Sequence, residues 1–264
     1  MTGAGGRGSH KVDADTMGRR TLDLHAGDGG QDAPSIEALA DDAWLLHLHG
    51  DADAGTIDAA SNARVHALCA RLQARRAYWV RDLVPAYASL AVFFDPSRVG
   101  AAAAAQWLLD EARAVASSAP DAASGGRLVE IPVVYGGEAG IDLASSAAEL
   151  GLAPDELVRR HAAAEYTVAM IGFAPGFPYL LGLDPALALP RLATPRARVP
   201  AGSVGIGGAQ TGIYPRESPG GWRLIGRTPW TLFDAAREPP SLLAPGDRVR
   251  FVPVDATAVR PGSP

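Results

Sequence analysis

Glycine and proline dominate the stretch from Ile171 to Trp222, and this bias constrains the fold more than any other feature. Ten of its 52 residues are glycine and eight are proline. Glycine admits positive φ, whereas proline fixes φ and lacks an N–H donor, so the stretch cannot form a run of helices. Two short apolar runs between turn residues, SVGI and TGIY, predict instead short β-strands that close on themselves.

Aromatic residues distinguish this stretch from a disordered linker, which would lack them. They stand singly among the turn residues and include Phe173, Phe177, Tyr179, Tyr214 and Trp222. Polar side chains are sparse, and Gln210 and Thr211 follow two glycines that would let a ligand approach the backbone. A rigid aromatic surface with few polar groups is typical of a small-molecule or partner site. We therefore predict a functional site here, in which Gln210 and Tyr214 orient the ligand.

One segment within the stretch is a candidate contact surface. Its residues are Phe173, Ala174, Pro175, Gly176, Phe177, Pro178 and Tyr179. Pro175 and Gly176 suit the two central positions of a type II turn, which requires positive φ at the second. The segment is either a structural turn whose aromatic rings fill a barrel or a surface that a partner grips.

Charged candidates are few. Arg196, Arg198 and Arg227 offer forked donors suited to carboxylate or phosphoryl groups, and Arg196 is favoured because Pro195 and the VPAG segment stiffen its surroundings. His161 is either an acid/base group or carboxylate donor, or a residue that interacts with the last carbonyls of its helix. No Ser–His–Asp order, paired-carboxylate spacing, metal cluster or GxxxxGK[ST] motif stands out. The sequence thus predicts a binding site without a complete catalytic set, and no metal.

Composition excludes several classes of function. The 264 residues carry a net charge of −5, which gives no support to nucleic-acid binding. Lys11 is the only lysine, and it lies in a tail (1–35) that we expect to be disordered, like the tail at 257–264. A biotinyl-lysine or Schiff-base lysine in an ordered site is thereby excluded. No apolar run approaches the ~20 residues that span a bilayer, and no secretory signal is evident, so we expect a cytoplasmic protein.

Hydrophobic periodicity predicts an α+β chain of two domains. The first, 36–126, is expected to be ferredoxin-like, with the order β-α-β-β-α-β when a strand at 127–134 is counted as its last. The segment 119–126 is rich in Ala, Ser and Gly and marks the boundary. The second domain, 127–256, contains many short strands and brief helices, which is typical of a closed β-barrel.

The cysteine and two histidines of the first domain are expected to be structural. Cys69 is the only cysteine, so no internal disulfide forms, and it falls on the apolar stripe of a helix at 58–76. His47 and His49 alternate with apolar residues in a strand at 43–49 and have no evident third ligand. We interpret them as solvent-facing side chains rather than metal ligands.

Three segments carry a family resemblance: GFAPGFPYLLGL, PRLATPRARVPAGSVGIGGAQTGIYP and SPGGWRLIGRTPWTLFD. They are similar to signatures of the family of 5-oxoprolinase B subunits, also called KipI-like or allophanate hydrolase subunit 1. The resemblance extends through EIPVVYGG, DELVRRH and LAPGDRVRF and covers residues 43–254. His161 matches a histidine of the family motif. Val134 stands where many relatives have cysteine, which argues against a thiol role at that position.

The resemblance implies that the barrel is cyclophilin-like and that the chain works as a B subunit, enzymatic only inside a complex. The C subunit (KipA-like, or allophanate hydrolase subunit 2) would share the site that activates 5-oxoproline. The A subunit (LamB/YcsF-like) would complete the ATP-dependent opening to L-glutamate, and which of the three holds ATP is left open. One alternative is a regulatory protein that inhibits a sensor histidine kinase. Another is a carboxyltransferase half-site of a urea-carboxylase-like system, which would require a separate biotin carrier. Prolyl isomerase activity would rest on fold analogy alone.

Overall fold

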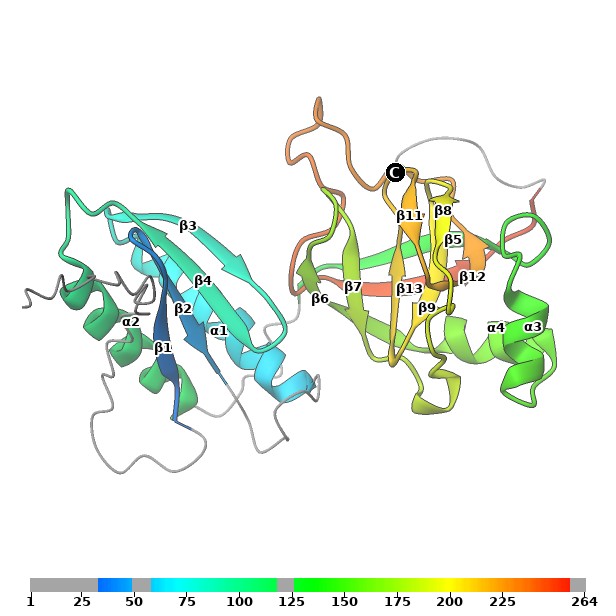
Figure 1. The fold of residues 1–264 in the computed structure, drawn as a ribbon, viewed down its shortest axis with the longest axis horizontal. Coiled ribbons are helices and arrows are strands. Elements are labelled where there is room, and N and C mark those ends of the chain that lie inside the picture. The colour runs from blue at the N-terminus through cyan, green and yellow to red at the C-terminus, as the bar shows by residue number, and fades with distance from the viewer. Residues whose placement is uncertain (1–32, 49–57, 118–125, 257–264) are drawn as a thin grey trace, which may run out of the picture.

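The computed structural model describes residues 33–48, 58–117 and 126–256, which form an open sheet and a closed barrel (Figure 1). Several predicted features lie outside these residues. They are the N-terminal tail up to residue 32, which includes Lys11; His49; residues 119–125 of the linker; and the tail at 257–264.

The first half of the chain forms an antiparallel four-stranded sheet in the order β1-β2-β4-β3. Its strands are β1 (Ser35–Ala40), β2 (Ala43–His47), β3 (Val80–Pro85) and β4 (Ser89–Phe94). The helices α1 (Ala59–Arg75) and α2 (Ala101–Ala116) lie together on one face, as Figure 1 shows. Apolar side chains of both helices and of β2 and β4 share one hydrophobic core, so these elements form a single folding unit.

Local sequence explains helix α1. The carboxylate of Asp58 accepts hydrogen bonds from the N–H groups of Ala60 and Ser61, which is the N-cap arrangement. Apolar residues at helical spacing then face the core: Val65, Leu68 and Leu72. Cys69 is half-buried beside them, and burial raises the pKa of its thiol. The thiol therefore stays protonated at neutral pH, in agreement with a structural role.

The ferredoxin-like order is not confirmed. The strand predicted at 127–134 is β5 (Leu128–Tyr135), and it pairs with strands of the barrel rather than with the first sheet. The first sheet instead contains β1, a strand that was not predicted, so its described order is ββαββα. Alternation of apolar residues identifies a strand but does not name the strand beside it, which explains the error.

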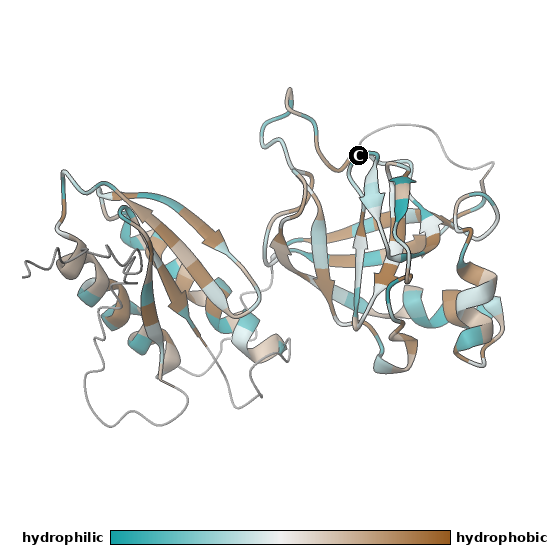
Figure 2. Ribbon diagram, viewed as in Figure 1, coloured by the Kyte–Doolittle hydropathy of each residue, from teal (hydrophilic) through white to brown (hydrophobic). Residues whose placement is uncertain are grey.

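The second half of the chain forms a closed barrel, as predicted, and the α+β class is confirmed with it. That the barrel is cyclophilin-like stays a prediction. The strand order around the barrel is β10-β7-β6-β13-β5-β12-β9. Besides β5, the strands are β6 (Glu165–Ile171), β7 (Pro178–Leu181), β9 (Ser203–Gly207), β10 (Gln210–Ile213), β12 (Arg223–Arg227) and β13 (Arg248–Pro253). Figure 2 shows that hydrophobic residues concentrate on the strands of both sheets, as a buried interior requires.

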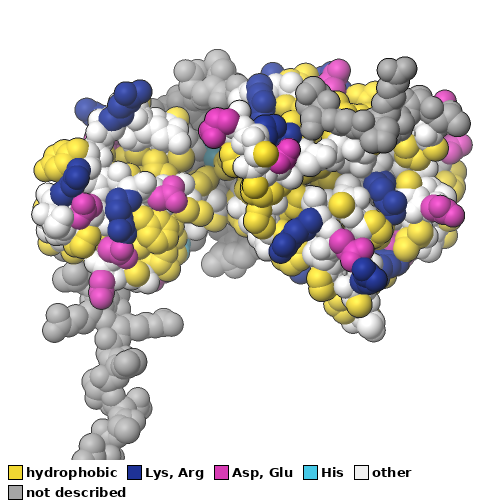
Figure 3. Space-filling view, turned by 90° about the horizontal axis from the view of Figure 1, so that it is seen from above, with side chains coloured by type: hydrophobic (Ala, Val, Ile, Leu, Met, Phe, Trp, Pro, Cys, Tyr) yellow, Lys and Arg dark blue, Asp and Glu magenta, His cyan; other side chains and the backbone are white. Residues whose placement is uncertain are grey.

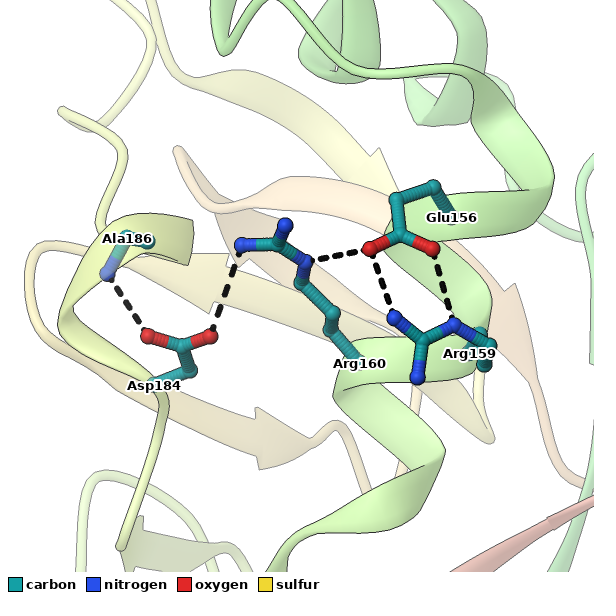
Figure 4. Close-up of polar contacts among 5 residues, drawn as sticks. All are labelled: Glu156, Arg159, Arg160, Asp184 and Ala186. Carbon is teal, nitrogen blue, oxygen red and sulfur yellow. Dashed lines mark hydrogen bonds and ion pairs between the residues drawn. The ribbon is translucent and has the colours of Figure 1, made fainter.

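Four smaller elements flank the barrel: α3 (Leu143–Glu149), α4 (Pro154–Ala163), the 3-10 turn η1 (Pro185–Leu187) and a two-stranded ribbon of β8 (Arg196–Val199) and β11 (Ser218–Gly220). Glu156 of α4 pairs with Arg159 and Arg160, and Arg160 lies 3.9 Å from Asp184 before η1 (Figure 4). Hydrogen bonds from Arg159 and Arg160 lower the pKa of Glu156 to about 2. The two pairs of Glu156 lie within α4, and the pair of Arg160 with Asp184 links the helix to the segment before η1.

The sheet and the barrel meet at an irregular point of β6. The ladder between β6 and β7 shifts register between Val168 and Met170, which leaves Ala169 outside the regular pairing. The Ala169 carbonyl accepts hydrogen bonds from Asn62 Nδ2 at 3.2 Å and His66 Nε2 at 3.0 Å, both from α1. The bulge thus supplies the acceptor that joins the two halves. Figure 3 shows them side by side, with charges of both signs interspersed over the visible face.

Candidate functional site

The side chains of β9 and β10 alternate between the barrel interior and its outer face. The interior set belongs to the barrel core and comprises Val204, Ile206 and Ile213. On the outer face a Cβ added at Gly207 would lie 2.5 Å from Cε2 of Trp222, and one at Gly212 would lie 3.0 Å from Cζ3. The space that the sequence suggested for a ligand at Gly207 is therefore filled by Trp222. Gly208, by contrast, has nothing within 4 Å of its Cβ position.

Five predicted site residues lie together on this outer face, and we call them the aromatic cluster: Phe173, Phe177, Tyr179, Tyr214 and Trp222. The centroid of the Phe177 ring lies 5.1 Å from that of Tyr214 and 5.6 Å from that of Trp222, with the rings edge to face. Their hydrophobic cluster is separate from the barrel core, so these rings do not fill the barrel.

The loop before β7 presents Phe173 to solvent. Its side chain is 62% exposed, and its φ of 65° lies in the left-handed region, which bulky residues rarely adopt. The N–H of Ala174 donates to the Gly172 carbonyl at 2.7 Å, which makes Phe173 the centre of a strained γ-turn. Gly176 has a φ of 78°, as the predicted type II turn requires. A strained, exposed aromatic residue is typical of a functional contact.

Tyr87, between β3 and β4, brings the first sheet to the aromatic cluster. Its ring lies 5.9 Å from that of Tyr179, and Gln210 Nε2 donates a hydrogen bond to its hydroxyl at 2.5 Å. Burial raises the pKa of Tyr87 to about 12, so the phenol stays protonated. Tyr87 is not among the predicted site residues, because no sequence spacing relates a turn of the first domain to a strand of the barrel. Tyr87 and Gln210 lie 123 positions apart.

Arg191 was also missed as a site residue. It is exposed in the segment between η1 and β8, and its guanidinium carbon lies 5.9 Å from the centroid of the Trp222 ring. Burial raises the pKa of Tyr179, and the positive charge of Arg191 opposes that rise, as it also does for Tyr87. The arrangement places one cation beside several neutral phenols on a rigid aromatic floor, which suits a small anion.

His161 and Thr211 lie inside the barrel rather than on this face. The Thr211 hydroxyl donates to the Gly205 carbonyl at 3.0 Å, so it accepts from His161 Nε2, also at 3.0 Å. Nδ1 then accepts from the Tyr135 hydroxyl at 2.8 Å, and the imidazole stacks on Phe251. Burial lowers the pKa of His161 to about 3. In this arrangement the ring is neutral and has no nitrogen left for a substrate.

Arg196 anchors the ribbon of β8 and β11 to the barrel. Its Nη2 donates to Oδ1 of buried Asp142 at 2.6 Å, and the other oxygen of Asp142 accepts from the N–H of Leu224 at 2.7 Å. Arg196 Nη1 is buried without a partner among the described residues. Arg198, in contrast, forms an exposed pair with Glu217. Arg196 is thus held by a buried carboxylate at the base of the ribbon, whereas Arg198 is not.

Two comparisons with known proteins show the family of the chain. The family model for the carboxyltransferase domain, subdomain C and D, matches residues 34–243. The 5-oxoprolinase B subunit of Bacillus subtilis is 41% identical over 224 residues, which are 82% of this chain and 91% of that protein. The chain belongs to the family of 5-oxoprolinase B subunits.

Other proteins match this chain over part of their length. The 5-oxoprolinase B subunit of Escherichia coli O157:H7 is 60% identical over 127 residues, or 58% of its length. The crystal structure of TTHA0988 shows 37% identity and a TM-score of 0.68, and the match covers 83% of this chain but only 41% of that one. The urea amidolyase of K. lactis has a TM-score of 0.67, and the match covers 85% of this chain and 15% of that one; at 20% identity, it shares the fold alone.

In this member of the B-subunit family, Arg227 lies apart from the aromatic cluster. It borders an open cavity of about 610 Å³ beside the ends of β5, β12 and β13, together with Val134 and Thr228. Its Nε is buried without a partner among the described residues. Within the same residues, no group of three or more His, Cys, Asp or Glu could hold a metal, and no helix is long and apolar enough to cross a membrane.

Proposed function

We propose that this chain is the B subunit of an ATP-dependent 5-oxoprolinase and that it shares with a C subunit the site that activates 5-oxoproline. The observation that carries the proposal is the aromatic cluster, which meets Tyr87, Gln210 and Arg191 on the outer side of the barrel. The match across 91% of a 5-oxoprolinase B subunit supports it.

The proposed site requires a partner for chemical reasons. The aromatic cluster offers binding groups, whereas His161, the histidine that the family motif highlights, has both ring nitrogens engaged inside the barrel. Exposed Phe173, held in a strained turn, is the best candidate for the contact with the C subunit. We therefore assign substrate and partner contacts to this face and the missing reactive groups to the partner subunits.

ATP is assigned to the assembled complex rather than to this chain alone. The sequence contains no P-loop motif, and its only lysine is Lys11, outside the described residues. Among the described residues, Arg227 has no carboxylate partner and borders an open cavity, so it is a group that fits a phosphoryl oxygen. The proposal accordingly needs phosphate ligands from the other two subunits.

Reconstitution tests the function. The chain is combined with the C and A subunits, and glutamate and ADP are measured from 5-oxoproline and ATP. We expect turnover only with all three components; turnover by this chain alone, or equal turnover by the other two without it, would contradict the proposal.

Phe173→Ser tests the partner contact in the same system. We expect weaker capture of the C subunit, together with lower turnover at equal concentrations and an unchanged melting temperature. The matched control is Ile141→Ser, which removes a side chain of similar exposure, 57%, outside the aromatic cluster. Equal effects of the two variants would count against a contact at Phe173.

A carboxyltransferase half-site is the second candidate function, because the matching family model describes a carboxyltransferase domain and a urea amidolyase is 48% identical over 58 residues. A biotinyl carrier from another protein would then be required. Transfer of carboxyl from a carboxylated biotin carrier, measured without 5-oxoproline, separates this candidate from the first.

A further inference from the structure

Arg191 differs from the next two arginines in the chain. Arg196 pairs with Asp142 and Arg198 with Glu217, whereas in the part of the chain that the structure describes Arg191 has no carboxylate partner. It is nevertheless held in place, because its guanidinium lies over the ring of Trp222 at 5.9 Å. An exposed arginine that is positioned but not neutralised is available to bind an anion.

The contact with Trp222 determines which part of Arg191 remains free. A cation–π contact holds the guanidinium through its charge, and its N–H donors lie in the plane of the group. Those in-plane donors match the two oxygens of a carboxylate. Trp222 itself cannot retreat, since Gly207 and Gly212 lie directly beneath its ring. The floor of the site is therefore rigid.

Neutral hydroxyl groups from both halves of the molecule lie within the electrostatic reach of this cation, since its charge opposes the rise that burial causes in the pKa of Tyr87 and of Tyr179. Gln210 donates to the Tyr87 hydroxyl, so the phenolic hydrogen of Tyr87 remains available to donate elsewhere. Tyr179, whose ring is 5.9 Å from both Tyr87 and Trp222, contributes a second hydroxyl. A ligand here would touch the first sheet through Tyr87 and the barrel through the other residues.

We propose that Arg191 binds the carboxylate of a small carboxylic-acid substrate, with Tyr87 donating a further hydrogen bond from the opposite half of the chain. The inference rests on the proposed function, in which that substrate is 5-oxoproline. Arg191 is thus the substrate-binding cation, and the Tyr87–Gln210 hydrogen bond keeps the two halves of the site in register.

The first test compares Arg191→Gln, Arg191→Lys and the control Arg198→Gln in the reconstituted complex. We expect Arg191→Gln to raise the KM for 5-oxoproline about tenfold or more, because a charge-assisted hydrogen bond is lost. Arg191→Lys should recover part of the loss, and kcat and the melting temperature should change little. An unchanged KM in Arg191→Gln overturns the proposal while leaving the proposed function standing.

The second test does not depend on turnover. The Trp222 indole N–H resonance, assigned with Trp222→Phe, is followed while the chain is titrated with 5-oxoproline or with 2-pyrrolidinone, which lacks the carboxylate. We expect 5-oxoproline to bind more tightly than 2-pyrrolidinone and to lose that advantage in Arg191→Gln. Equal binding of both compounds, or no response to either, overturns the role of Arg191 even if the complex is active. An inactive wild-type complex with carboxylate-dependent binding would reject only the proposed reaction.

Discussion

The ring of Trp222 lies so close to Gly207 that a Cβ at this glycine would come within 2.5 Å of it. Gly205 and Gly212 approach the same side chain, at 3.1 Å and 3.0 Å from the positions where their Cβ atoms would stand. The glycines of this motif thus serve internal packing of a tryptophan, which in turn supports Arg191.

Gly207→Ala should displace Trp222 and lower the free energy of unfolding by about 1–3 kcal/mol, the usual cost of overpacking. The change is measured by denaturant unfolding, with tryptophan fluorescence as a local probe. Gly221→Ala is the matched control, because its nearest heavy atoms are 3.6 Å away and its φ is not positive. Equal stability of the two variants would refute this account of the motif.

Arg196→Ala should destabilise the fold. Removal of the guanidinium leaves buried Asp142 without its charged partner, which costs about 1–3 kcal/mol. Arg198→Ala breaks only an exposed pair with Glu217 and should change stability by less than about 1 kcal/mol. Thermal melts of both variants decide the matter, and an unaltered Arg196→Ala melt would show that the ribbon does not need this anchor.

Tyr87 and Gln210 should be energetically coupled across the junction between sheet and barrel. In a double-mutant cycle of Tyr87→Phe and Gln210→Leu, we expect a coupling energy of about 1 kcal/mol, since either single change leaves a polar partner unsatisfied. Tyr78→Phe is the control, because Tyr78 is 71% exposed. Strict additivity of the two single changes would be inconsistent with the hydrogen bond.

His161 should make stability depend on pH. Its pKa is lowered to about 3 by burial, while in the unfolded chain it stays near the ordinary value of about 6.5. Between these values only the unfolded state binds the proton, so stability is retained above pH ~6.5 and falls as pH drops toward ~3, by at most about 1.4 kcal/mol per pH unit. His161→Gln should show a shallower slope in denaturant unfolding across this range. Parallel slopes would exclude a contribution from His161.

Local patterns predicted much of the fold. Alternation identified β2, whose Trp44 and Leu46 are buried, and helical spacing placed Cys69 beside the core of the first sheet. The pairing of strands was harder to predict from the sequence, because the partners of a strand depend on distant residues. Strand β5 has the expected position in the chain but lies in the barrel.

The candidate site was predictable to the same extent. Composition alone indicated the rings of the aromatic cluster, since aromatic side chains that stand singly among glycines and prolines are expected to pack against one another. Composition could not tell that Thr211 points into the barrel and its neighbour Gln210 points outward, because the direction of each side chain depends on the phase of the strand within the closed barrel. Tyr87 joins the site only through tertiary contacts, and only the contact with Trp222 distinguishes Arg191 from the other polar residues of its stretch.

Strand β13 has a consequence for how the chain folds as it leaves the ribosome. It pairs with β5 in parallel and with β6 antiparallel, so the last described strand closes the barrel. The first sheet is complete once α2 has emerged and can fold early, since domains fold as units from the N-terminal side during synthesis. The nascent barrel instead keeps two open strand edges, on β5 and β6, until translation passes residue 253, and over this interval those edges can pair with other chains.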